Sequence, residues 1–93
     1  MTIRIDRTTD EVGQETWRAT LRLRPKAGEV HFDEVREAMT DSELQTTAAL
    51  HRMAGTKGAE FYEPPIVSLR GVTGGMLVTA TARVVPRDWP WVV

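Results

Sequence analysis

Hydrophobic and polar residues alternate along residues 16–24, TWRATLRLR, and this is the clearest pattern in the chain. Alternation with a period of two is typical of a strand with one buried and one solvated face. The apolar face would carry Trp17, Ala19, Leu21 and Leu23. The polar face would carry Arg18, Thr20, Arg22 and Arg24.

Three further segments are predicted to be strands. Residues 2–6 alternate over a short distance, and residues 7–15 after them are polar and contain a glycine, which favours a loop. Residues 66–72 and 75–85 are rich in β-branched and apolar residues and are separated by glycine-rich turn residues. In the last strand, Ala80 and Ala82 fall on the apolar face, where small side chains would let a helix approach closely. Ala48 and Ala49 are the residues expected to complete this contact from the helical segment.

Residues 33–54 have a helical composition between a candidate N-cap, Asp33, and a candidate C′ glycine, Gly55. Polar Ser42 and Thr46 interrupt the apolar stripe, and possible capping boxes begin near residues 40–42. We therefore expect a short helix over 33–39 and a longer one over 42–54, with a single helix as the alternative. Phe61 and Tyr62 are expected to hold the irregular connection after the helical segment to the core.

These elements predict a single small α+β domain over residues 1–87. The expected order is ββααββ: a four-stranded antiparallel sheet with one or two helices packed on one face. A Trp-rich tail, residues 88–93, would follow, docked on the domain's own core or on a partner subunit.

Charge is unevenly distributed although the chain of 93 residues has a formal net charge of only −1. Residues 1–28 carry six basic and four acidic residues, residues 29–63 three and eight, and residues 64–93 three and one. An acidic middle between basic flanks bears on the choice of partner more than on the fold.

Catalytic chemistry has no positive signal in the sequence. The chain has no cysteine and two histidines, His31 and His51, which lack the spacing of a metal site. Ser42 and Ser68 lie in no nucleophile motif, and the glycine-rich segments do not match phosphate-binding loops. We therefore assign no catalytic, cofactor-binding or metal-binding residue.

The arginines of the strands are the candidate partner-binding residues. If the predicted faces are right, Arg18, Arg22, Arg24 and Arg83 share the outward face of the sheet, joined by Arg4 and Arg70 if the other strands follow the same parity. Guanidinium groups in rows can bind carboxylates or phosphates in bidentate fashion. The alternative is that arginine and threonine only keep a solvated face soluble.

The tail contributes the other two candidates, Trp89 and Trp91. A tryptophan buries about 150–250 Å², so exposure of both rings would forgo several kcal/mol in a domain whose total stability is about 5–15 kcal/mol. We expect the tail to dock, either beside Trp17 or across to a second subunit.

The sequence thus favours a small cytoplasmic interaction protein, a homodimer or other homo-oligomer or a component of a protein assembly, with no cofactor. One alternative is a nucleic-acid-binding protein that uses the arginine face or residues 40–55, which resemble the helix pair of a helix-turn-helix. Another is a small enzyme or ligand-binding protein with a pocket between helix and sheet. The lack of a signal-peptide-like or membrane-spanning apolar run agrees with a cytoplasmic protein.

Overall fold

Four strands form one antiparallel sheet in the computed structural model, which describes residues 2–24 and 32–86. Strands β1 (Ile3–Thr9) and β2 (Glu15–Leu23) form one hairpin, and β3 (Ile66–Val72) and β4 (Gly75–Val84) form another. Because β2 also pairs with β4, the strand order is β1-β2-β4-β3. The two hairpins thus meet at the long strands, and β1 and β3 form the edges.

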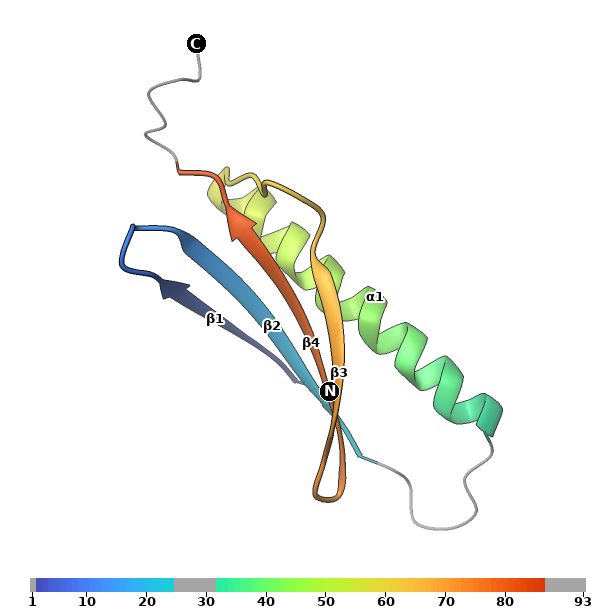
Figure 1. Ribbon diagram of the computed structural model, residues 1–93. Helices are drawn as coiled ribbons and strands as arrows, with labels where there is room; N and C mark the ends of the chain where they lie inside the picture. Colours follow the sequence, from blue (N-terminus) through green and yellow to red (C-terminus); the bar gives the residue numbers. More distant parts are fainter. Residues whose placement is uncertain (1, 25–31, 87–93) are drawn as a thin grey trace.

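A single helix, α1 (Phe32–Lys57), joins the hairpins and covers one face of the sheet (Figure 1). The element order is therefore ββαββ: the α+β class and the antiparallel four-stranded sheet are confirmed, whereas the two-helix division is not. Over the described residues, no helix combines the length and the apolar content needed to cross a membrane.

The helix continues through residues 40–42 because its two polar interruptions are satisfied within it. Ser42 Oγ donates a hydrogen bond to the Ala38 carbonyl (2.6 Å), and Thr46 Oγ1 donates to the Ser42 carbonyl (2.9 Å). Both residues are buried. These hydrogen bonds to the preceding turn remove the free-energy penalty of burying the two hydroxyl groups. The hydroxyls therefore do not need to cap a second helix, and one helix continues through this point.

The helix ends later than the sequence predicts, at Gly58 instead of Gly55. Gly58 has a φ of 63°, its N–H donates to the Gly55 carbonyl, and the Ala59 N–H donates to the Ala54 carbonyl. This pair of bonds is a Schellman motif, in which a left-handed glycine follows the last helical turn. Ala59 packs against the core, so the motif also directs the chain back toward the sheet.

The core lies between α1 and the central strands. Trp17, Ala19, Ala80 and Ala82 are all 2 % exposed or less, as the predicted inward parity requires. Leu50 of α1 packs on this group with Ala54. The buried helix residues of this cluster are thus Leu50 and Ala54, with Met53 packed beside them, whereas the expected contributors differ: Ala48 is exposed and Ala49 is half-buried.

The first predicted strand differs at its end. Strand β1 extends to Thr9, three residues beyond the expected end, because Asp10 closes the hairpin. Its Oδ1 accepts the backbone N–H groups of Val12 (3.0 Å) and Gln14 (2.8 Å), so the ladder continues to the Thr9–Glu15 pair. The tail, residues 88–93, lies outside the described residues.

Candidate functional site

The face of the sheet opposite α1, which we call the outer face, is the largest surface that the sequence singled out. Strand register decides its members, because residues paired across strands share a face. Arg18 pairs with Asp6 on one side and Thr81 on the other, and Thr81 pairs with Ile66. The strand positions that share this parity are Arg4, Asp6, Thr8, Thr16, Arg18, Thr20, Arg22, Ile66, Ser68, Arg70, Val72, Gly75, Leu77, Thr79, Thr81 and Arg83.

Three of the four predicted arginines therefore lie together on the outer face. Arg18, Arg22 and Arg83 are exposed at outer-face positions, and Arg24 is exposed directly after the end of β2. The other two expected arginines, Arg4 and Arg70, are also exposed on this face. Strands β1 and β3 thus follow the same parity as the central strands.

Some of these arginines are engaged within the domain, which limits what they can offer a partner. Arg4 Nε lies 3.2 Å from Asp6 Oδ1, and Arg22 Nη2 donates to the carbonyl of Thr73 in the β3–β4 turn (2.8 Å). Surface ion pairs contribute little to stability, so a stronger ligand can exchange with them. Each guanidinium also has further N–H donors, because it carries five in all.

Hydroxyl groups occupy much of the space between the arginines. Thr20 pairs with Thr79 and Thr79 with Ser68, so three neighbouring strands present hydroxyls in one row. The three threonines at positions 20, 79 and 81 are half-buried, which leaves their hydroxyls near the surface. The outer face is consequently a polar surface of hydrogen-bond donors with a positive charge, suited to an anionic or carboxylate-rich surface.

One part of the outer face is hollowed and less polar. A depression of about 250 Å³ is lined by Glu63, Ile66, Ser68, Thr81, Ala82 and Arg83. Glu63 Oε1 accepts a hydrogen bond from Arg83 Nη2 (2.7 Å) at one side of it. Ile66 is 64 % exposed, so this depression adds an apolar contact to the charged face.

Tyr62 belongs to the same neighbourhood and was not expected there. Its backbone N–H donates to the Arg83 carbonyl (3.0 Å), and the Arg83 guanidinium carbon lies 5.5 Å from the centre of its ring. The sequence predicted that both Phe61 and Tyr62 would hold the connection to the core. Only Phe61 does so, edge-on to Trp17 with ring centres 5.7 Å apart, whereas Tyr62 is exposed.

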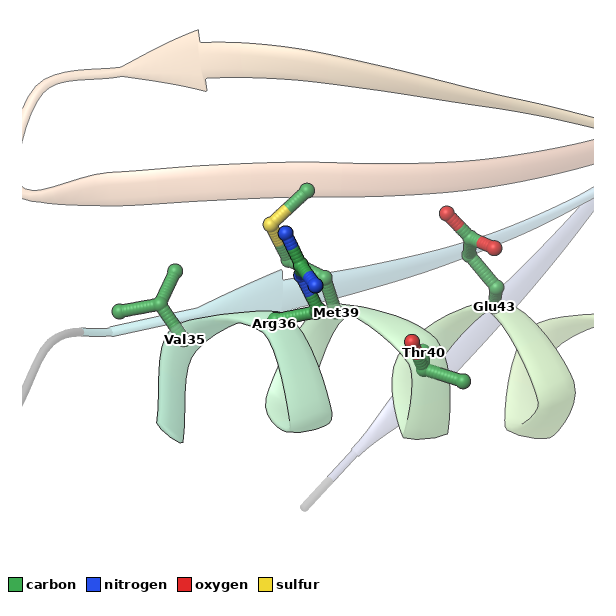
Figure 2. A pocket seen from close by; sticks show the side chains of 5 residues that line it. All are labelled: Val35, Arg36, Met39, Thr40 and Glu43. Carbon is green, nitrogen blue, oxygen red and sulfur yellow. The ribbon is translucent and has the colours of Figure 1, made fainter. Parts of the chain in front are cut away.

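A second depression lies on α1 (Figure 2). It has a volume of about 280 Å³ and is lined by Val35, Arg36, Met39, Thr40 and Glu43. Val35, Met39 and Glu43 project from one side of the helix, and Thr40 projects from another. Two apolar side chains, one arginine and one glutamate on a single stretch of helix can contact a partner. They do not include a nucleophile with a neighbouring general base, which a catalytic site would need.

Residues with catalytic potential are not brought together within residues 2–24 and 32–86. The Ser42 hydroxyl is buried and bonded within its helix, whereas Ser68 lies on the outer face. The ring of His51 packs against Phe61, with ring centres 5.7 Å apart. The described residues also contain no cluster of three or more side chains suited to a metal ion. His31 lies outside this part of the chain.

The N-terminal half of α1 carries most of the acidic residues on its exposed side, opposite in charge to the outer face, whereas Arg52 and Lys57 are exposed in its C-terminal half. Asp33, Glu37 and Asp41 are exposed. Each lies nine positions before a buried residue, namely Ser42, Thr46 and Leu50. Nine residues correspond to about two and a half helical turns, so the acidic and the buried residues lie on opposite sides of the helix. The acidic residues therefore point away from the sheet. The two-layer domain is thus basic on the outer face of the sheet and acidic on the opposite side over the N-terminal half of α1.

The other two candidates from the sequence, Trp89 and Trp91, lie outside the described residues, so their role as docking residues stays a prediction. Comparison of the chain with models of protein families, with curated proteins and with solved structures gives no match in any of the three. The outer face and the acidic side of α1 are therefore interpreted from their own geometry and chemistry.

Proposed function

We propose that this is a small non-catalytic interaction protein, and that its outer face binds an acidic surface of another protein molecule in a homo-oligomer or a larger assembly. The observation that carries this proposal is the composition of that face. It holds five exposed arginines and a single aspartate at strand positions, next to an exposed isoleucine.

Two physical arguments support a protein partner. A solvated antiparallel face needs only polar residues, and threonine alone would meet that need. Arginine is instead enriched in protein interfaces, where its planar fork binds carboxylates and its stem packs on apolar side chains. A cysteine-free chain also suits a protein that works in a reducing cytoplasm.

A photo-cross-linking residue at Thr20, in the middle of the outer face, tests this proposal inside the source cells. We expect cross-links to protein, and their loss when Arg18→Glu and Arg22→Glu are added. The matched control is the same cross-linking residue at Val12, which is 89 % exposed in the β1–β2 turn and belongs to neither the outer face nor α1, so its cross-links should not depend on those two arginines. Absence of any arginine-dependent cross-link from Thr20 would overturn the proposal.

Nucleic acid is the second candidate partner, favoured by Tyr62. This exposed ring beside Arg83 offers one surface on which a base could stack, next to guanidinium groups that could bind phosphate. The helix-turn-helix alternative does not apply, because α1 runs without a turn from residue 32 to residue 57.

The two candidates differ in their salt dependence and in the role of the ring. Nucleic-acid binding should weaken by about 0.7–0.9 log units per log unit of salt for each phosphate contact. It should also weaken in Tyr62→Ala. Absence of binding to a single-stranded DNA probe at low salt would exclude this candidate and leave the protein partner.

A further inference from the structure

We infer that the acidic partner of the outer face is a second copy of this chain, which supplies the exposed side of its helix α1. This inference rests on the proposed use of the outer face. It is carried by the matching charges, apolar residues and spacings of two surfaces that lie on opposite sides of the same domain.

The first match is charge. The exposed side of α1 carries Asp33, Glu37 and Asp41, which we call the acidic stripe. The outer face carries Arg18, Arg22 and Arg70 at three of its strand positions. Two outer faces would repel each other, and so would two acidic stripes, because like charges face one another in both arrangements. Docking of one surface on the other is the arrangement that pairs opposite charges.

The second match is apolar. Leu44 continues the acidic stripe by one turn of the helix and is 65 % exposed, and Ile66 on the outer face is 64 % exposed. A large exposed apolar side chain beside charges is typical of the centre of an interface surrounded by a polar rim. Contact between these two side chains would remove both from water at once.

The third match is spacing. Ile66 and Arg70 are four residues apart on β3, or about 13 Å at the rise of a strand. Glu37 precedes Leu44 by seven residues and Asp33 precedes it by eleven, or about 10 and 16 Å along a helix. When Leu44 lies on Ile66 and α1 runs antiparallel to β3, Glu37 and Asp33 therefore fall on either side of the level of Arg70. Arg22 lies at that level too, because both arginines pair with Leu77.

The symmetry of this contact follows from the fold. The outer face and the acidic stripe lie on opposite sides of a two-layer domain, so one pair of copies cannot form both contacts with each other (Figure 1). Each copy keeps one surface free for the next. Such a heterologous contact gives rows or rings instead of a closed two-fold dimer.

Two surface variants test the pairing in purified, nucleic-acid-free protein. The face variant carries Arg18→Glu and Arg22→Glu. The helix variant carries Glu37→Gln, Asp41→Asn and Leu44→Ser. All five positions are exposed, and circular dichroism checks that both variants keep the fold. Arg7→Glu is the matched control, an exposed arginine whose parity places it on the opposite side of the sheet.

Sedimentation at low salt should show that the mass of the wild-type chain rises with concentration beyond a dimer and falls in high salt. Each variant alone should be a monomer, with self-association at least tenfold weaker, whereas Arg7→Glu should match the wild-type chain. A mixture of the two variants should form a 1:1 dimer and nothing larger, because each retains one functional surface.

Three results would overturn the inference. They are a monomeric wild-type chain at every concentration, a face variant that assembles like the wild-type chain, and two monomeric variants that do not associate when mixed. None of them removes the proposed function if Thr20 still cross-links to a different protein in an arginine-dependent manner. Loss of that cross-link as well would remove both.

Discussion

Replacement of Ala80 by leucine tests how closely α1 lies on the sheet. Ala80 is fully buried and pairs with Ala19 on β2 and Val67 on β3. Leu50 of α1 belongs to the same buried cluster. The Ala19–Ala80 pair thus forms a shallow strip across the two central strands, on which the helix packs without large side chains between the layers.

The size of the effect follows from this geometry. Leucine adds three carbon atoms at a position between buried Ala19 on β2 and half-buried Val67 on β3, with a helix above it. Protein interiors are packed as densely as organic crystals, so the new atoms must displace the helix or force side chains from their preferred rotamers. Overpacking of this kind costs about 1–3 kcal/mol, a large part of a total stability of about 5–15 kcal/mol.

Urea unfolding followed by the helix signal in far-ultraviolet circular dichroism measures this cost. With a slope of about 1–3 kcal/mol per M, the unfolding midpoint should fall by about 1 M. Ala48→Leu is the matched control, because Ala48 is exposed on the same helix and leucine is nearly as good a helix former as alanine. Its midpoint should stay close to that of the wild-type chain.

A midpoint for Ala80→Leu within the range of the Ala48→Leu control would refute the reasoning. It would mean that the space above Ala80 is open or that α1 moves away at little cost. Tryptophan fluorescence is a poorer probe of this transition, because the chain has two tryptophans besides Trp17.

Two further predictions concern the ends of β4. A methyl group at Gly75 would collide with the backbone carbonyl of Leu23, so Gly75→Ala should lower the free energy of unfolding by more than about 1 kcal/mol in the same urea assay. Gly71→Ala is the control: its methyl group meets nothing within 4 Å, so its free energy of unfolding should fall much less. Deletion of residues 88–93 should lower the urea midpoint without changing the mass in solution, because burial of two tryptophans on the domain's own core would stabilise it by several kcal/mol at most. A fall from oligomer to monomer with unchanged stability would instead indicate a latch between subunits, and no change in either quantity would show that the tail does not dock.

Residue order alone determined which side chains share a face of the sheet. Side chains alternate along any strand, so the parity of residues 16–24 and 75–85 separated the arginines from the core before any pairing was known. Both ends of β3 and the start of β4 also lie where the sequence predicts them, because glycines mark the turn between the two strands. Gly74 in that turn has a φ of 79°, which other residues rarely adopt.

The tertiary structure decided the features that depend on distant residues. Ser42 and Thr46 look like a break in an amphipathic helix, but burial against the sheet favours small side chains there, and bonds to the preceding turn satisfy their hydroxyls. Tyr62 lies in a segment without periodicity, so its position beside the outer face comes from backbone pairing with the distant end of β4, through the bond of its N–H to the Arg83 carbonyl and the adjacent Phe61–Val84 bridge. Strand order likewise follows from the pairing of β2 with β4, residues more than 50 positions apart. Local geometry repeats along the chain and can be read from it, whereas these contacts form only when separate segments pack together.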